Sequence, residues 1–261
     1  MWSRPHFAIA AASLAFFACT PAGAQLSRPL PLSSAPGTAA MACVVAPRPD
    51  SLWSLAQCCA QNLKSDPDCR LYDQANEFII LKDNSPMKPD AYLIIPTVKM
   101  TGVDDKQIFV PPFVDFWADG WRQAQNYLKK PPAETALAIN SVRGRTQNQL
   151  HIHISCVRAD VAHALAENDA KIGSDPATAL PLALGPRGNT YRVIKVANLT
   201  ASNSPYNLAA AMPGAKDDMA DQSIAVIGSS TPGQYYVLDT YAHDANRGAA
   251  EELLEQTCRG S

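Results

Sequence analysis

An alternating run of polar and apolar residues near the middle of the chain constrains the fold most. From Gln149 to Ser155 the sequence reads Gln-Leu-His-Ile-His-Ile-Ser, so polar and aliphatic side chains alternate without a break. Successive side chains of a β-strand point to opposite faces of its sheet. We therefore predict a strand whose aliphatic face packs on the core and whose other face presents Gln149, His151 and His153. Such a row of ring nitrogens and amide groups suits either metal binding or attack on phosphorus.

The rest of the chain alternates between hairpin patterns and helical patterns, which indicates an α+β fold with an antiparallel sheet. The expected helices cover residues 51–63, 111–130, 158–167, 205–212 and 248–257. The expected strands cover residues 77–82, 91–98, 136–142, 149–157, 190–196, 223–228 and 234–240. Segment 176–186 is rich in proline and glycine, and we expect a loop there. The second helix has one apolar face, which either packs in the core or forms the wall of a lipid or base pocket. This face comprises Phe113, Phe116, Trp117, Trp121, Ala124 and Leu128.

The N-terminus is typical of a secretory signal peptide. A short polar stretch precedes an apolar run, and Ala22-Gly23-Ala24 fits the small-residue cleavage pattern. We expect a signal peptide at residues 1–24, a flexible leader at residues 25–50 and one folded domain at residues 51–261. The apolar run is shorter than the roughly 20 residues that span a bilayer, but its retention as an N-terminal anchor is an alternative. Either way the protein is expected to be exported and periplasmic.

Charge and cysteine content narrow the functional classes further. A net charge of −2 gives no basic surface of the kind that binds nucleic acid, so no nucleic-acid partner is expected. Beyond the predicted signal peptide lie Cys43, Cys58, Cys59, Cys69, Cys156 and Cys258. An even number of cysteines in an exported protein favours disulfides. We expect a short loop that joins Cys58 or Cys59 to Cys69, and a long-range bond between Cys156 and Cys258.

The histidine row can carry nucleophilic chemistry. Imidazole attacks phosphorus to give a labile phosphoramidate, which divides one difficult displacement into two easier ones. Nearby donors must then neutralise charge on the phosphoryl oxygens. Candidates for this role lie shortly before the row; they are Asn140, Arg143, Arg145 and Thr146. The alternative is a periplasmic protein that binds zinc or copper through His151 and His153, for which Gln149 would be a poor third ligand.

These residues resemble the motif of the histidine-triad superfamily. Its members carry Gly-Gln-Ser-x-x-His-x-His-x-His after a strand that ends in asparagine. Here the frame from Gly144 to His153 reads Gly-Arg-Thr-Gln-Asn-Gln-Leu-His-Ile-His, so Gln149 stands in place of the first histidine. Asn140 takes the place of the asparagine at the strand end. Residues 78–96 look like the first hairpin of that superfamily, in which the position of Asp83 usually holds the ribose hydroxyls.

Within this superfamily the chain is similar to the bacterial CDP-diacylglycerol pyrophosphatase family. The residues that carry the similarity are Leu81-Lys82-Asp83 and the block from Ala138 to Asn148, which runs into His151-Ile152-His153-Ile154-Ser155-Cys156. The resemblance implies a phosphoric anhydride hydrolase that converts CDP-diacylglycerol to CMP and phosphatidate with neither a metal nor another cofactor. A lipid substrate also implies contact with the inner-membrane surface. The alternative within this chemistry is a hydrolase or nucleotidyltransferase that acts on a soluble nucleotide diphosphate.

The resemblance implies a role for each candidate residue. His151 would attack the cytidylyl α-phosphorus, while His153 and Gln149 would hold the non-bridging oxygens. The phosphates would be bound by Asn140, Thr146, Arg145 and Arg143, and the nucleoside by Lys82 and Asp83. Histidine-triad domains usually form dimers of small protomers. We therefore expect the segment after about residue 185 to replace part of a second protomer.

Overall fold

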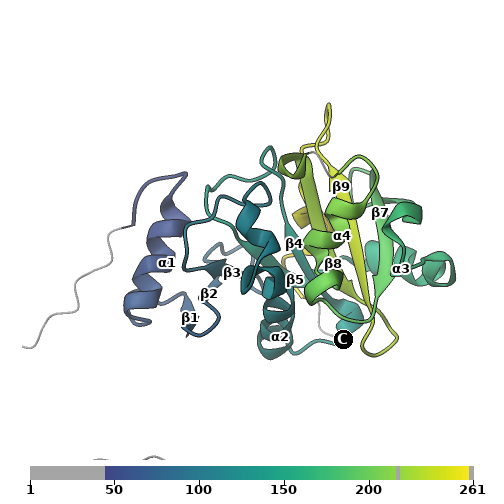
Figure 1. The fold of residues 1–261 in the computed structure, drawn as a ribbon. Helices are drawn as coiled ribbons and strands as arrows, with labels where there is room; N and C mark the ends of the chain where they lie inside the picture. Colours follow the sequence, from purple (N-terminus) through teal and green to yellow (C-terminus); the bar gives the residue numbers. More distant parts are fainter. Residues whose placement is uncertain (1–44, 216–217, 259–261) are drawn as a thin grey trace, which may run out of the picture. The chain divides into compact units, whose positions relative to one another are not determined.

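The computed structural model describes residues 45–215 and 218–258, all of which belong to one compact unit. The predicted signal peptide and most of the predicted leader lie outside these residues. Helices packed on an antiparallel sheet confirm the predicted α+β class (Figure 1).

Four helices and seven strands of the described residues occur in the predicted order, with corrections at their ends, whereas the strands at residues 69–73, 180–184 and 254–255 were not predicted. The helices are α1 (Ser51–Gln61), α2 (Phe116–Leu128), α3 (Ala159–Asn168) and α4 (Pro205–Ala211). The strands are β1 (Cys69–Asp73), β2 (Phe78–Lys82), β3 (Tyr92–Pro96), β4 (Thr135–Ile139), β5 (Ile152–Val157), β6 (Leu180–Leu184), β7 (Asn189–Val196), β8 (Gln222–Gly228), β9 (Tyr235–Tyr241) and β10 (Leu254–Glu255). They form one sheet in the order β1-β2-β3-β5-β4-β8-β9-β7-β6, and β10 pairs with the end of β5.

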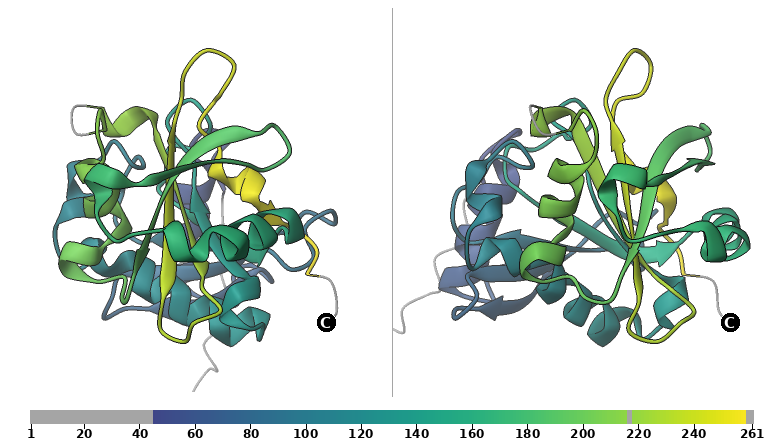
Figure 2. Two further views of the ribbon diagram at one scale, coloured as in Figure 1. Left: turned by 90° about the vertical axis from the view of Figure 1, so that its right-hand side faces the viewer. Right: turned by 45° about the vertical axis from the view of Figure 1, so that its right-hand side comes forward.

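The sheet has a helical layer on each face. Helices α2 and α4 pack on one face, where the aromatic stripe of α2 meets aliphatic strand residues such as Ile80, Ile94 and Ile154. Helix α1 covers strands β2 and β3 on the other face, and α3 covers the far end of that same face. In both views of Figure 2 the yellow C-terminal turn lies across the sheet from α4. The stripe of α2 is therefore core, and the alternative that it walls a ligand pocket is wrong.

The two halves of the sheet repeat one arrangement. In the first half, hairpin β2–β3 is followed by α2 and hairpin β4–β5; in the second, hairpin β6–β7 is followed by α4 and hairpin β8–β9. The strand order β2-β3-β5-β4 in the first half corresponds to β6-β7-β9-β8 in the second, and the halves join where β4 pairs with β8. The second arrangement begins at Leu180, close to the boundary expected near residue 185. That this half replaces part of a second protomer stays a prediction.

Two C-terminal predictions are wrong. Residues 180–184, expected as loop, form strand β6, which pairs with β7 through partners such as Leu182 and Tyr191. Pro181 is tolerated there because β6 is an edge strand, where a missing N–H costs no ladder bond. Segment 248–257, expected as a helix, is instead a short 3-10 turn followed by β10. Its backbone is held by partners outside the segment, because the N–H of Ala250 donates to Ser223 and strand β10 pairs with β5.

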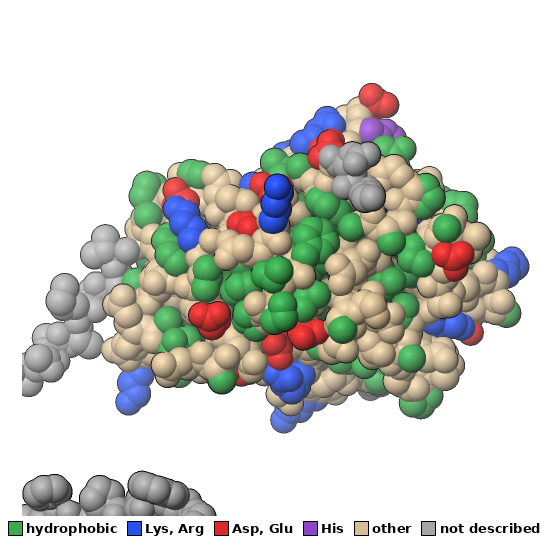
Figure 3. Space-filling model, in the orientation of Figure 1, with side chains coloured by type: hydrophobic (Ala, Val, Ile, Leu, Met, Phe, Trp, Pro, Cys, Tyr) green, Lys and Arg blue, Asp and Glu red, His purple; other side chains and the backbone are tan. Residues whose placement is uncertain are grey.

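Two expected disulfides are present, joining Cys59 to Cys69 and Cys156 to Cys258. Disulfides persist in oxidising compartments, so they indicate an exported protein. Within the described part of the chain, no helix is long and apolar enough to cross a bilayer. On the face shown in Figure 3, positive and negative side chains are interspersed among hydrophobic ones, without a broad field of one sign.

Candidate active site

The predicted histidine strand is confirmed, although it begins later than expected. Strand β5 starts at Ile152, and residues 140–151 leave the sheet as a loop between β4 and β5. Leu150, Ile152 and Ile154 are buried in the core on the α2 side. His151 and His153 face the other way and line a cavity of about 540 Å³. The alternating pattern therefore places both imidazoles in one cavity.

The protonation state of His151 follows from its surroundings. Its Nδ1 lies 2.7 Å from the backbone oxygen of Gln149. Because a carbonyl oxygen only accepts, Nδ1 carries the proton and Nε2 keeps its lone pair. Burial, with a smaller contribution from His153, lowers the pKa of His151 to about 4. At neutral pH the ring is therefore neutral, with a fixed tautomer and a free lone pair on Nε2.

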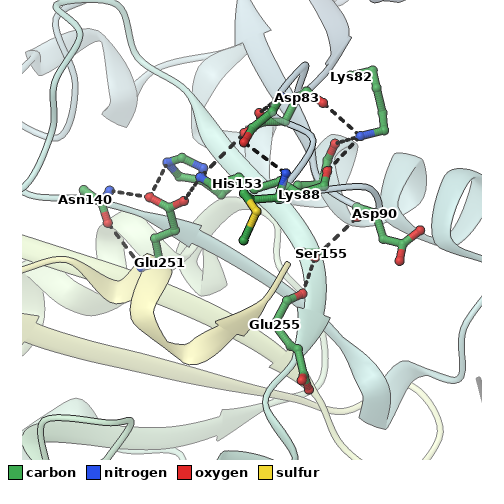
Figure 4. A network of polar contacts seen from close by, with 12 residues as sticks. Lys82, Asp83, Lys88, Asp90, Asn140, His153, Ser155, Glu251 and Glu255 are labelled. Carbon is green, nitrogen blue, oxygen red and sulfur yellow. Dashed lines mark hydrogen bonds and ion pairs between the residues drawn. The ribbon is translucent and has the colours of Figure 1, made fainter. Parts of the chain in front are cut away.

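His153 lies beside a carboxylate that comes from the C-terminal segment. Its ring centroid is 4.9 Å from that of His151, and its Nε2 is 3.4 Å from Oε2 of Glu251 (Figure 4). This is the distance of an ion pair, and Nε2 makes no directed hydrogen bond to any described residue. That nitrogen is buried next to Glu251, although the His153 side chain lines the cavity. Burial lowers the pKa of His153, whereas the charge of Glu251 opposes that change.

Lys88 completes the charged network of this cavity. Its Nζ lies 2.5 Å from Oε1 of Glu251 and 3.6 Å from Oδ2 of Asp83 (Figure 4). Burial opposes the charge of Lys88, but the hydrogen bond and charge of Glu251 raise its pKa. Burial likewise opposes the charge of Glu251, but His153, Lys88 and Asn140 lower its pKa to about 2. Lys88 and Glu251 therefore keep their charges at neutral pH, and the network presents Lys88 to the cavity.

The loop before β5 brings several predicted phosphate ligands to the cavity. Asn140 and Thr146 line it, and the side chain of Asn140 also contacts Glu251. Gly144, the glycine of the predicted frame, lies so close to the C-terminal segment that a Cβ atom there would be 2.5 Å from the backbone oxygen of Gly248. Glycine is thus required at this point of the frame for the loop to pack against the chain that carries Glu251.

Three predicted polar residues lie away from the open cavity or are held by other groups. The amide of Gln149 is fully buried and donates to the backbone oxygens of Pro96 and Val98. Arg145 forms an ion pair with Asp104, at 2.5 Å, behind His151. Arg143 is exposed on the loop and does not line the cavity. None of the three is therefore among the groups that the structure brings to the cavity wall.

The predicted nucleoside ligands both line the cavity. Nζ of Lys82 donates to three backbone oxygens, those of Asp83, Lys88 and Ala91, at 2.9–3.1 Å. Its main effect is thus to fix the turn that follows β2. Asp83 accepts a hydrogen bond from the backbone of Ser85 and also faces Lys88. The apolar part of the lining comes from two places: α1 and the residues before it supply Val45, Leu52 and Leu55, and strands β2 and β3 supply Leu81 and Leu93.

Metal binding was the main alternative for this histidine row. Among the described residues, no group of three or more His, Cys, Asp or Glu side chains is arranged to hold a metal ion.

Comparison with known proteins identifies the family. A family model described as CDP-diacylglycerol pyrophosphatase matches residues 47–261. The chain belongs to this family. A curated CDP-diacylglycerol pyrophosphatase of Yersinia pestis is 34% identical over 224 residues, which cover 80% of this chain and 84% of that relative.

Two solved structures are similar over part of the chain. One is a DUF4931 family protein from Bacillus cereus ATCC 10987, with a TM-score of 0.43 and 12% identity over 67% of this chain and 87% of that protein. The other is yeast Ap4A phosphorylase Apa2 in complex with Ap4A, with a TM-score of 0.41 and 10% identity over 64% of this chain and 57% of that protein.

For this member of the CDP-diacylglycerol pyrophosphatase family, the sequence did not reveal Lys88 or Glu251 as part of the site. Lys88 lies in a turn-rich connection, where lysine is common. Glu251 lies about a hundred residues beyond the histidines, in a segment with a helical pattern. The available signal was the expected bond between Cys156 and Cys258, because it brings the C-terminal segment to the end of the histidine strand.

Proposed function

We propose that this protein hydrolyses the diphosphate bond of CDP-diacylglycerol through a cytidylyl-histidine intermediate on His151. The hydrolytic activity follows from the family to which the chain belongs. The state of His151 supports the proposed intermediate, because Nδ1 donates to the Gln149 carbonyl and leaves Nε2 unprotonated at the cavity. A hydrogen bond from the other ring nitrogen to a backbone carbonyl fixes both the tautomer and the orientation of a reacting imidazole.

The reaction has two balanced steps. In the first, the Nε2 lone pair of His151 forms a bond to the cytidylyl α-phosphorus. The bond from that phosphorus to the bridging oxygen breaks, and phosphatidate leaves with the electron pair. In the second, a water molecule attacks the same phosphorus and loses a proton to solvent. The phosphorus–nitrogen bond breaks, CMP is released and His151 recovers its lone pair. Phosphatidate is a good leaving group, so the first step requires little acid assistance.

The other groups of the cavity bind and orient. His153 donates to a non-bridging oxygen of the α-phosphate, and Asn140 and Thr146 contact the phosphates from the preceding loop. Asp83 lies at the nucleoside end. Lys88 is the cation of the charged network that faces the cavity, so it is the best placed to neutralise the diphosphate.

The predicted residues that do not line the cavity affect the reaction indirectly. Gln149 supports His151 by fixing residues 96–100, to which all its amide contacts run. Arg145 and Arg143 were predicted to bind phosphate. In this proposal Arg145 contributes its positive charge from behind His151, and Arg143 contacts only the outer part of the substrate.

The lipid part of the substrate requires an apolar surface beside the cavity. Helix α2, whose aromatic face was the possible pocket wall in the sequence, is buried on the other face of the sheet. The apolar wall at α1, which includes Leu52 and Leu55, supplies that surface instead. We place the enzyme in the periplasm, at the inner-membrane surface, where such a substrate resides.

The decisive experiment replaces His151 by Asn and follows release of CMP from CDP-diacylglycerol. The variant should lose more than about a thousandfold in turnover, because loss of a nucleophile removes most of the catalysis. The wild-type protein mixed briefly with cytidylyl-labelled substrate should carry an acid-labile label on the peptide that contains His151. His163→Asn is a matched control, since that side chain is 73% exposed on α3 and lies outside the cavity.

Turnover by His151→Asn at the wild-type rate would show that another group is the nucleophile. Assays on CDP-choline and on dinucleotides would separate a lipid substrate from a soluble one. Activity that depends on stoichiometric zinc and is lost in chelator would instead support the metal-binding alternative.

A further inference from the structure

We propose that Glu251 is a positioning residue for this reaction, whose carboxylate fixes the ring of His153 and tethers Lys88 beside the cavity. The inference rests on the proposed function, because it gives His153 and Lys88 the task of holding the diphosphate. It assigns to the C-terminal segment a part of the site that lies far from the histidine motif in the sequence.

The carboxylate of Glu251 is shared between Lys88 and His153. Oε1 lies 2.5 Å from Nζ of Lys88, and Oε2 lies 3.4 Å from Nε2 of His153. Asn140 donates to the same Oε2 at 3.3 Å and accepts a hydrogen bond from the backbone N–H of Glu251 at 3.2 Å. The side chain of Asn140 therefore fixes both the backbone and the carboxylate of Glu251 (Figure 4).

The segment that carries Glu251 is fastened to the histidine strand itself. Strand β10 pairs with the end of β5, and Ser155 of β5 donates to the backbone oxygen of Glu255 at 2.6 Å. The disulfide between Cys156 and Cys258 joins the same two segments. His153 and Glu251 are therefore held by one rigid unit, and their separation does not depend on a mobile loop.

The charges around Lys88 explain why a carboxylate is useful at a site that binds an anion. Glu251 and Asp83 both face Lys88. Burial favours the neutral form of Lys88, and these negative charges oppose that tendency and raise its pKa. Burial lowers the pKa of His153 in spite of Glu251, so its ring is neutral at neutral pH. A CDP-diacylglycerol molecule carries one negative charge on each phosphate. Glu251 thus keeps Lys88 charged and both side chains in place before the substrate arrives.

The neighbouring carboxylate provides a matched control. Glu252 is also largely buried, but it faces the second half of the sheet, where it binds Arg187 at 2.9 Å and Asn189 at 2.7 Å. It does not line the cavity. Glu251→Gln and Glu252→Gln remove the same charge from adjacent positions of one segment, so they separate an effect on the site from an effect on the segment.

The test compares the full-length wild type, Glu251→Gln and Glu252→Gln in kcat, KM and the pH profile of kcat/KM. If Lys88 must be charged, kcat/KM falls as pH rises through its pKa. Removal of Glu251 lowers that pKa, so this alkaline fall should begin at a lower pH in Glu251→Gln than in the wild type. At a pH above the fall, kcat/KM should decrease about tenfold or more relative to wild type. Glu252→Gln should keep the wild-type pH profile.

A folded Glu251→Gln variant with the wild-type pH profile would overturn the proposal. Glu251→Asp keeps the charge but withdraws it from Lys88, so it should shift the profile in the same direction and by less. If Glu251→Gln melts below the assay temperature, the Asp variant decides, and an unchanged profile there overturns the proposal. Loss of activity in His151→Asn together with an unchanged Glu251→Gln would reject this inference alone. Full activity in His151→Asn would reject the proposed nucleophile instead.

Discussion

The two halves of the sheet share one arrangement of strands and differ in what lies on it. Each half consists of a hairpin, a helix and a second hairpin, and the strand order is the same in both. In the first half, the face away from α2 carries His151 and His153 beside an open cavity. In the second half, the corresponding face carries Tyr191, Val193 and Leu238 and is closed by α3 and the C-terminal turn.

The C-terminal segment shows the same contrast within two adjacent residues. Glu251 faces the first half, where it shares its charge between Lys88 and a histidine that makes no directed hydrogen bond to a described residue. Glu252 faces the second half, where Arg187, Asn189 and Tyr191 all donate to it. A polar cluster whose members satisfy one another stabilises the fold, whereas one with donors left over can bind a ligand.

This contrast predicts that changes in the second half affect stability and that changes in the first half affect activity. The largest expected effect on stability is at Arg192 of β7, which donates to the fully buried carboxylate of Asp239 and to Gln222 on the α4 face. Arg192→Met leaves Asp239 buried without its cation, which should cost about 3–5 kcal/mol in free energy of unfolding. Urea denaturation measures this loss.

The activity of each folded Arg192→Met molecule should stay at the wild-type level, because the pair lies on the face opposite the cavity. Arg158→Met is the matched control, since its pair with Asp160 is largely exposed and should contribute less than about 1 kcal/mol. A lower kcat with unchanged stability in Arg192→Met would break the contrast between the halves.

The next prediction concerns pH and the first half alone. Because the pKa of His151 is lowered to about 4, its Nε2 stays unprotonated well below neutral pH. We expect kcat/KM to hold as pH is lowered to about 5, and to fall about tenfold per pH unit below about 4. An acid limb near the ordinary value of about 6.5 would contradict the buried state of this ring.

The lowered pKa of His151 also makes the free energy of unfolding depend on pH. The folded protein binds a proton at His151 less readily than the unfolded chain does. Between about pH 6.5 and pH 4 the unfolded state therefore holds more protons, and this contribution to stability is lost as pH falls through that range. His151→Asn should remove this part of the pH dependence of unfolding, while the control His163→Asn should not.

The histidine strand was predictable because polar and aliphatic residues alternate along it. Only a β-strand places all the aliphatic side chains of such a run on one buried face. The same local reasoning failed for the partner of that strand. Residues 248–257 have a helical pattern, yet the backbone N–H groups of Ala250 and Glu251 donate to the side chains of Ser223 and Asn140. Ser223 lies 27 residues from Ala250, and Asn140 lies 111 residues from Glu251, so periodicity within the segment carries no sign of either partner.

Gln149 shows a second limit of sequence reasoning. The residue lies in the predicted frame, at the position of a histidine in the related motif, and the alternation places it beside His151. In the structure its amide nitrogen donates to the backbone oxygens of Pro96 and Val98, and its amide oxygen accepts from the backbone N–H of Met100. The loop after β3 leaves these backbone groups without partners in the sheet. Whether Gln149 or His151 faces the cavity depends on the course of this loop, and the motif does not predict that course.

The smallest effect is expected at Tyr191, where the second half meets the C-terminal segment. Its hydroxyl donates to Glu252 at 3.0 Å, and burial together with that carboxylate raises the pKa of Tyr191, so it remains a donor. Tyr191→Phe removes one of several donors to Glu252 and should cost about 1–2 kcal/mol in free energy of unfolding. Thermal or urea unfolding measures the loss, and kcat per folded molecule should not change. A fall in kcat at wild-type stability would mean that Glu252 transmits strain to Glu251, and the two faces of the segment would then have to be treated as one site.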